Sequence, residues 1–182
     1  MKAENDSVLV AECLNGNSRA YEVLVGKYER PIFNLALRMV KDYEDAADVA
    51  QTVFVKAYEN LRSYNPAHQF FSWIYRIAIN ESINFAKKRK THEEYESGRV
   101  ASLKESTPEE ALGDSELAGQ VGAAILRLKT DYRMVIVLKH YHDFSYEEMA
   151  EILDIPEKTV KSRLYTARQL LQRTLTERGL HT

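Results

Sequence analysis

The side chains best suited to binding a charged polymer are concentrated near the end of the chain. No acidic residue occurs from Lys158 to Thr176, whereas this stretch contains the basic residues Lys158, Lys161, Arg163, Arg168 and Arg173. At about 100° per residue, a helix here would carry one apolar stripe, formed by Val160, Leu164, Ala167 and Leu171. Roughly opposite lie polar side chains of the kinds that bond phosphates and base edges: Lys158, Thr159, Ser162, Tyr165, Thr166 and Gln169. The pattern predicts a helix that packs on one side and offers a basic side to DNA.

The residues just before this helix predict a shorter one and a tight turn. Ser145 and Glu148 have the Ser-x-x-Glu spacing of a capping box, so a helix should begin there. Asp154-Ile155-Pro156 should end it, with Pro156 at the first position of the next helix. Two helices joined in this way form a helix-turn-helix whose second helix enters the major groove. The alternative is a solvated helix face in a bundle, but such faces usually mix both signs of charge.

A second candidate nucleic-acid surface lies on a predicted helix from Phe70 to about Lys90. Aromatic residues crowd its start and basic residues its end. At 100° per residue, one ridge collects Trp73, Arg76, Asn80, Asn84 and Lys87. Aromatic faces stack on unpaired bases at about 1–3 kcal/mol each, while amides and cations bond base edges and phosphates. Each residue taken alone also has a plainer interpretation, in which Trp73 belongs to the core and the basic end complements the helix dipole. For the residues taken together, the binding interpretation is favoured.

A third face is acidic and must serve another purpose, because carboxylates repel phosphate. On the helix predicted to follow Asp42, the residues Asp45, Asp48 and Gln51 lie opposite the apolar stripe. This face is either solvated surface or a docking site for a basic protein.

The elements that position these residues are predicted to be helical throughout. Helical periodicity recurs along the chain, and glycine and proline are few, at seven and four residues. One helix is expected to cover Ala20 to Tyr28, and a second to begin at Pro31. Phe71 and Phe85 are assigned to the core of the helix that follows. The fold class is therefore all-α.

The charge of the chain is segregated. The net charge is −2, yet residues 91–116 hold two basic and eight acidic residues, a formal charge of −6, which leaves +4 for the remainder. This segment also contains turn residues and poor periodicity, so we expect a flexible acidic linker. The interpretation is two small helical domains, residues 1–90 and 117–182, joined by the linker 91–116.

Several classes of protein are disfavoured. No apolar run reaches the length of a membrane span, and the amino terminus lacks the apolar core of a signal peptide, so we expect a cytoplasmic protein. The single cysteine, Cys13, forms no internal disulfide and is expected to be a small buried residue. His140 and His142 are the nearest approach to a metal site, but positions two apart on a helix point in different directions. No metal, cofactor or catalytic residue is predicted.

Four stretches together resemble one family. Their order and spacing along nearly the whole chain are similar to those of bacterial sigma factors of the extracytoplasmic-function (ECF) group. The stretches run from Asp45 to Phe54, Phe71 to Asn80, Tyr146 to Leu153 and Thr159 to Leu164.

The resemblance implies a dissociable initiation subunit of RNA polymerase rather than an enzyme. Its first domain would bind the −10 promoter element and its second the −35 element. The acidic face, Asp45, Asp48 and Gln51, would contact the clamp of the polymerase largest subunit. The melted −10 strand would lie on Trp73, Arg76, Asn80, Asn84, Lys87, Lys88 and Arg89, beside a base-selecting loop at 63–69. The −35 recognition helix would use Lys158, Thr159, Lys161, Ser162, Arg163, Tyr165 and Arg168.

Some residues depart from the family pattern. Asn84 stands where many relatives have aspartate, and Asp154 and Lys158 stand where glycine is usual.

By analogy, a separate anti-sigma protein is expected as a regulatory partner. Two other classes are weighed against this one: a two-domain transcriptional regulator, which would bind duplex operator without polymerase, and a structural helical adaptor, which the acid-free helix disfavours.

Overall fold

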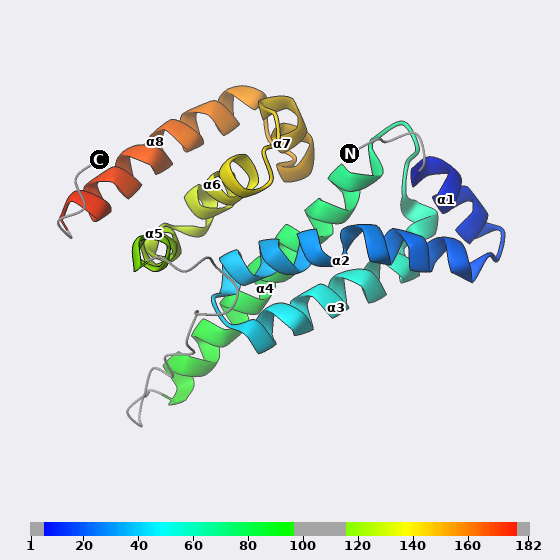
Figure 1. The fold of residues 1–182 in the computed structure, drawn as a ribbon, viewed down its shortest axis with the longest axis horizontal. Helices are drawn as coiled ribbons and strands as arrows, with labels where there is room; N and C mark the ends of the chain where they lie inside the picture. Colours follow the sequence, from blue (N-terminus) through cyan, green and yellow to red (C-terminus); the bar gives the residue numbers. More distant parts are fainter. Residues whose placement is uncertain (1–5, 97–115, 178–182) are drawn as a thin grey trace.

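A computed structural model describes residues 6–96 and 116–177, and within these ranges the regular structure is entirely helical (Figure 1). The first group of elements comprises α1 Asp6–Leu14, α2 Ser18–Val40, α3 Tyr43–Glu59, the short 3₁₀ helix η2 Leu61–Ser63, and α4 Phe70–Glu96. The second group comprises α5 Glu116–Arg127, α6 Thr130–Tyr141, α7 Tyr146–Leu153 and α8 Glu157–Thr176. The all-α prediction is confirmed, whereas most of the predicted linker lies outside the described residues.

The first group is built on the apolar faces of α2, α3 and α4. Tyr28, Leu35, Val53 and Ile74 are at most 1% exposed at the centre of this group. The short helix α1 is held against α2 by Asp6, which is buried and accepts hydrogen bonds from Lys27 Nζ and Tyr28 Oη. A buried carboxylate needs such partners, because an unpaired one would be expensive to desolvate.

The second group packs α7 and α8 around α6. Val135, Leu138, Met149 and Leu164, from three helices, are at most 1% exposed. At the start of α7, Glu148 N–H donates to Ser145 Oγ while Ser145 N–H donates to the Glu148 carboxylate, so the predicted capping box is confirmed. Asp154 ends α7 in the left-handed conformation at φ 54°, which a short polar residue tolerates better than most.

Three local predictions were wrong. The stretch predicted as separate helices is one helix, α2, with Pro31 inside it. Proline removes one backbone hydrogen bond, but residues on both sides of it, Tyr28 and Ile32 among them, are buried in the same core, and this packing holds the helix together. Pro156 is the N-cap of α8 rather than its first helical residue. Cys13 is half-buried rather than buried.

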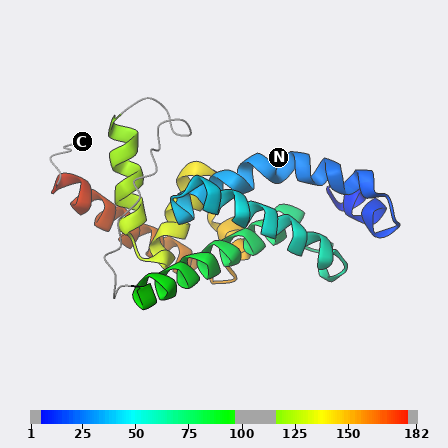
Figure 2. The ribbon, with the colours of Figure 1, turned by 90° about the horizontal axis from the view of Figure 1, so that it is seen from below.

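The two groups of helices pack directly against each other. The views in Figures 1 and 2 agree that α7 lies beside the first half of α4 and that α6 lies beside α2. Arg133 of α6 donates to the carbonyl of Met39 at the end of α2, at 2.6 Å. Within the part of the chain that the structure describes, no helix is long and apolar enough to cross a membrane.

Candidate nucleic-acid and protein interfaces

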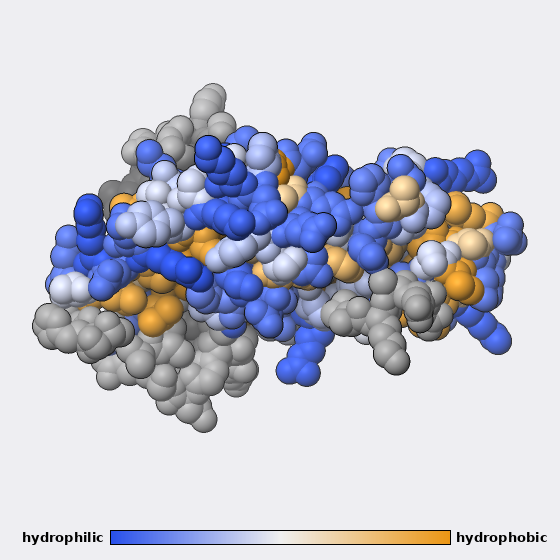
Figure 3. Space-filling view, turned by 90° about the horizontal axis from the view of Figure 1, so that it is seen from above, coloured by the Kyte–Doolittle hydropathy of each residue, from blue (hydrophilic) through white to orange (hydrophobic). Residues whose placement is uncertain are grey.

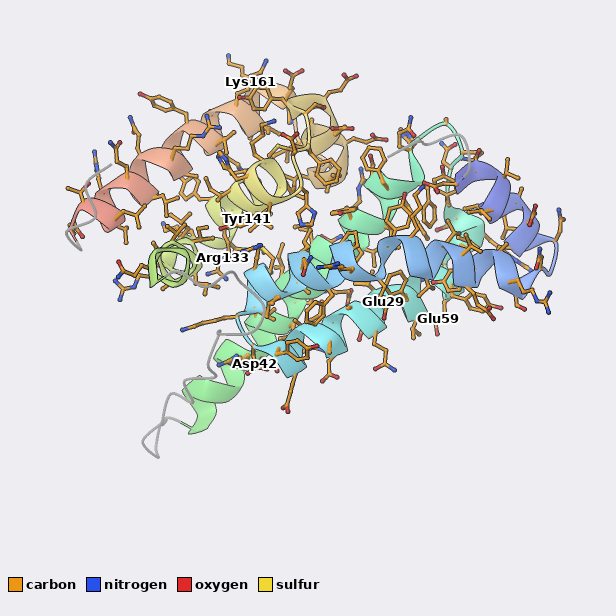
Figure 4. All side chains as sticks on the ribbon, in the orientation of Figure 1. Glu29, Asp42, Glu59, Arg133, Tyr141 and Lys161 are labelled. Carbon is orange, nitrogen blue, oxygen red and sulfur yellow. The ribbon has the colours of Figure 1, made fainter. Side chains whose placement is uncertain are left out.

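The basic helix α8 presents its polar side outward. Val160, Leu164 and Ala167 are fully buried against the second group. On the other side, five of the predicted DNA-binding residues are exposed: Lys158, Lys161, Ser162, Tyr165 and Arg168. Figure 4 shows Lys161 on the outer edge of α8, and the face of the molecule seen from this side is mainly hydrophilic (Figure 3). Thr159 and Arg163 are half-buried at its border.

Three cations of α8, Lys161, Arg163 and Arg168, have partners within the chain. Lys161 pairs with Glu157 at 2.5 Å, and Arg163 reaches back to Asp131 of α6 at 3.2 Å. Arg168 Nε donates to His140 Nε2 at 3.3 Å. Burial and the charges of Arg168 and Lys139 lower the pKa of His140, so its ring is neutral and able to accept. Exposed ion pairs are worth little, so phosphates could replace these partners.

The ridge on α4 divides into two parts. Towards its end, Asn80, Asn84, Lys87 and Lys88 are exposed. Arg89 is also exposed and pairs with Asp45 of α3 at 2.9 Å. These side chains lie along one helix and are accessible to a nucleic-acid strand.

The other part of the ridge, at the start of α4, is partly covered. Trp73 is half-buried, with its ring centroid 5.7 Å from that of Tyr64 and 5.6 Å from that of Phe70. Arg76 donates to the backbone carbonyl of Glu151 in α7. Trp73 therefore contributes to the core as well as to the surface, and Arg76 is engaged by the second group of helices.

Phe71 and Phe85 were assigned to the core of the first group. Phe85 is half-buried and packs against that core. Phe71 is half-buried as well, but its ring stacks on Phe144 of the second group, with centroids 5.5 Å apart. Phe71, like Phe85, packs against the hydrophobic core. Helical period showed that Phe71 faces inward but not that Phe144 of the second group covers it.

The acidic face on α3 is partly neutralised from within. Asp42 caps the helix that was predicted to follow it, its carboxylate accepting from Asp45 N–H at 3.0 Å. Burial and the neighbouring Asp42 raise the pKa of Asp45, while the Arg89 guanidinium opposes this shift. Asp48 and Gln51 are exposed to solvent. A basic partner would thus meet Asp48 and Gln51 first.

An apolar groove of about 960 Å³ runs between α2 and α3 beside this face. Gln51 is at its edge, and its lining includes Phe33, Phe54 and Tyr58. Figure 4 marks Glu29 and Glu59 on the two helices that form it. Tyr58 of α3 is 59% exposed in this groove. The sequence signal for this groove is the number of aromatic residues on α2 and α3, which is larger than the buried core of these helices uses.

The possible metal-binding histidines do not form a site. His140 bonds Arg168, while His142 follows the end of α6 and lies 3.0 Å from Tyr75 Oη through Nδ1. Among the residues that the structure describes, no cluster of three potential ligands is suited to a metal ion.

Comparison with known proteins identifies the class. Residues 24–92 match the family "Sigma-70 region 2", and residues 118–171 match "Sigma-70, region 4". RNA polymerase sigma-H factor of Pseudomonas aeruginosa is 34% identical, over 94% of both chains. The ECF RNA polymerase sigma-E factor of Escherichia coli is 37% identical, over 91% of this chain and 92% of its own. The ECF RNA polymerase sigma factor SigW of Bacillus subtilis is 34% identical over 91% of this chain and 94% of its own.

Solved structures agree in fold. CnrH in complex with the cytosolic domain of CnrY superposes with a TM-score of 0.73 at 26% identity, covering 95% of this chain and 98% of that one. The sigma factor RpoE of Bartonella quintana, in complex with the anti-sigma factor NepR, has a TM-score of 0.71 and shares the fold at 24% identity, covering 86% of this chain and 96% of that one. The protein belongs to the ECF group of RNA polymerase sigma factors, which are transcription regulators rather than catalytic enzymes.

Proposed function

We propose that this protein is an alternative sigma factor that binds core RNA polymerase, recognises −35 and −10 promoter elements and promotes DNA melting. The observation that carries this proposal is the separation of two basic surfaces, α8 and the end of α4, on two helical groups. One surface suits duplex DNA and the other suits an unpaired strand. In this proposal residues 1–90 form the polymerase-binding and −10 domain, 91–116 the linker and 117–182 the −35 domain.

The −35 element would be read by α8 in the major groove. A major groove admits one helix, and the exposed lysines, arginine, serine and tyrosine of α8 are side chains that bond base edges and phosphates. The second helix of a helix-turn-helix performs this role, and the capping box of α7 supports that arrangement. Arg163 would have to exchange Asp131 for a phosphate or remain a positioning residue for the helix.

The −10 strand would lie along α4. Asn80 and Asn84 could bond base edges, and Lys87 and Lys88 could follow the backbone phosphates. Trp73 and the loop at 63–69 lie at the start of the same helix, where a base that leaves the duplex could stack. Binding energy gained from the unpaired strand would offset the cost of melting.

The polymerase would dock on α3. Asp48 and Gln51 are exposed, and the apolar groove between α2 and α3 adjoins them. A basic coiled-coil element of the polymerase would meet charge and apolar surface together, which suits a stable protein interface. An anti-sigma protein is proposed as a further partner, since two solved relatives with this fold were captured with such partners or with a cytosolic fragment.

Transcription in vitro tests the whole proposal. The protein is mixed with bacterial core polymerase and a genomic fragment library, and the 5′ ends of the transcripts are sequenced. Discrete start sites with shared upstream motifs are expected. Duplex binding without polymerase-dependent initiation would instead identify a two-domain transcriptional regulator.

Variants of α8 then test the assignment of the −35 surface. The double variant Lys158→Ala, Lys161→Ala should weaken upstream duplex binding. The loss should be about 1–3 kcal/mol and depend on the sequence if the lysines read bases, and it should be uniform across sequences if they hold phosphates. Arg173→Ala, near the far end of the same helix, removes one comparable charge and is the control. Equal promoter occupancy by the parent chain, the double variant and Arg173→Ala would contradict the assignment of α8 to the −35 element.

A further inference from the structure

We propose that a small pocket between α2 and the end of α6 binds a small phosphate-bearing anion, of which inorganic diphosphate is the simplest example. The cations that hold this anion are Arg30 and Arg38, both on α2. The site goes beyond the function proposed above, because it involves neither DNA nor polymerase. It rests on positive charge for which the surrounding protein supplies no anion.

The pocket has a volume of about 240 Å³ and is lined from both helical groups. The first group contributes one side of α2, and the second contributes the end of α6 and the residue that follows it. The lining residues are Arg30, Pro31, Asn34, Arg38, Tyr141 and His142. None of these residues is acidic. Sites for drug-sized ligands measure roughly 300–1,000 Å³, so this pocket suits a smaller ligand.

The polar lining residues of α2 lie along one side of that helix. Arg30, Asn34 and Arg38 follow one another at intervals of four residues, and residues four apart are neighbours on a helix surface. With a rise of 1.5 Å per residue, the two arginines begin about 12 Å apart along the helix axis. Their long side chains can therefore approach a ligand from its two ends. A diphosphate offers one phosphoryl group to each guanidinium.

Neither arginine has an acidic partner. Among the residues that the structure describes, no carboxylate forms an ion pair with Arg30 or Arg38. Two acidic residues are adjacent to the lining in sequence, but they are placed elsewhere. Glu29 lines the groove between α2 and α3, which Arg30 also borders. Asp143 has a side chain that is 99% exposed and pairs with Lys139 at 3.6 Å.

Arg38 has the greater need of an anion. Its guanidinium carbon lies 3.4 Å from the centre of the Tyr141 ring, and Figure 4 shows Tyr141 on the side of α6 that faces α2. The side chain is half-buried, and burial lowers the pKa of Arg38. The ring contacts the flat face of the guanidinium, whereas its N–H groups point outward in the plane. These donors remain available to an anion in the pocket.

His142 adds to the excess of donors over acceptors. Its Nδ1 lies 3.0 Å from Tyr75 Oη, and burial together with the charge of Arg38 lowers the pKa of His142 to about 4. Burial raises the pKa of Tyr75, so the hydroxyl donates to Nδ1 of a neutral ring and Nε2 carries the proton. This Nε2 is buried and has no hydrogen-bond partner among the described residues.

The donors favour phosphate over carboxylate. A guanidinium presents five N–H groups in a fixed fork that can bond two oxygens of one phosphate. Asn34 is exposed between the two arginines and adds amide donors. A diphosphate has more oxygens and more charge than a carboxylate, so it satisfies this set more fully. Because the lining comes from both helical groups, the bound anion would connect α2 with the end of α6.

Isothermal titration calorimetry of the full chain with inorganic diphosphate, in magnesium-free buffer of low ionic strength, tests the site. The test variants are Arg30→Gln and Arg38→Gln. Arg30 is exposed, so its variant remains informative if Arg38→Gln disturbs the fold. Arg19→Gln is the matched control, because Arg19 is an exposed arginine of the same helix outside the pocket. The double variant Lys158→Ala, Lys161→Ala controls for anions that bind to α8.

We expect a single diphosphate to bind, and Arg30→Gln and Arg38→Gln each to weaken its binding about tenfold or more. Arg19→Gln and the α8 double variant should stay within about twofold of the parent chain.

Four outcomes would overturn the proposal. An equal loss in Arg19→Gln would show that the anion responds only to net charge. A loss confined to the α8 double variant would place the anion on the basic helix. Equal affinity for succinate, a dicarboxylate, would reject phosphate as the class of ligand. Absence of binding up to about 1 mM diphosphate would reject the site itself.

Discussion

Acid should loosen the contact between the two helical groups through protonation of His142. This ring is stacked near Phe144, is edge-on to Tyr75, and has Nδ1 3.0 Å from Tyr75 Oη. Burial, with a smaller contribution from the charge of Arg38, lowers the pKa of His142 to about 4. Burial also raises the pKa of Tyr75, so its hydroxyl stays protonated and donates to the neutral ring.

The sign of this pH effect follows from the difference in the pKa of His142 between the closed arrangement of the two helical groups and the open one. A separated domain would return this pKa toward its ordinary value of 6.5, so the open state binds the proton more readily. The closed arrangement keeps its full stability above pH 6.5 and loses it progressively as the pH falls toward 4. At 1.36 kcal/mol per pKa unit, the full effect is about 3 kcal/mol, of which about 2 kcal/mol is lost by pH 5. That is roughly a thirtyfold change in the opening equilibrium.

The assay is energy transfer between dyes attached to Glu59→Cys in α3 and Gln172→Cys in α8, in a Cys13→Ser background, recorded from pH 8 to pH 5. Transfer should be constant above about pH 7 and decline below pH 6.5. His142→Asn is the matched variant, because its amide oxygen can still accept from Tyr75 but the side chain does not titrate. Transfer that declines equally in His142→Asn, or that stays constant in the parent chain, would refute this reasoning.

Three further changes test other parts of the structure. Ser145→Ala removes the capping box of α7 and should lower the free energy of unfolding by about 1 kcal/mol in urea denaturation; no loss would contradict the role of the cap. Tyr28→Phe deletes the buried hydrogen bond to Asp6 and should cost about 1–3 kcal/mol in the same assay, whereas Tyr58→Phe, on an exposed ring, should cost nothing measurable. If Lys161 holds a phosphate, Lys161→Ala should reduce the slope of the logarithm of the duplex binding constant against the logarithm of the salt concentration by about one. An unchanged slope would exclude that contact.

The sequence was sufficient wherever a feature depends on neighbours along the chain. The capping box at Ser145, the cap at Asp42 and the polar and apolar sides of α8 all follow from spacings of three or four residues, and each is present in the structure. The resemblance to sigma factors could also be recognised from the sequence, because the motifs of this family are contiguous and occur in a fixed order. These features are local, so no knowledge of the tertiary fold was needed to find them.

The partners of inward-facing residues were decided only by the tertiary structure. Helical period places Phe71 on a covered face, yet only the packing of α7 on α4 shows that Phe144 covers it. The same packing gives Arg76 the carbonyl of Glu151 as its partner. Pro31 is an equally clear case, since its local preference to begin a helix is outweighed by burial on both sides of it. Contacts between residues 70 or more positions apart depend on how whole helices pack, and no local pattern encodes that choice.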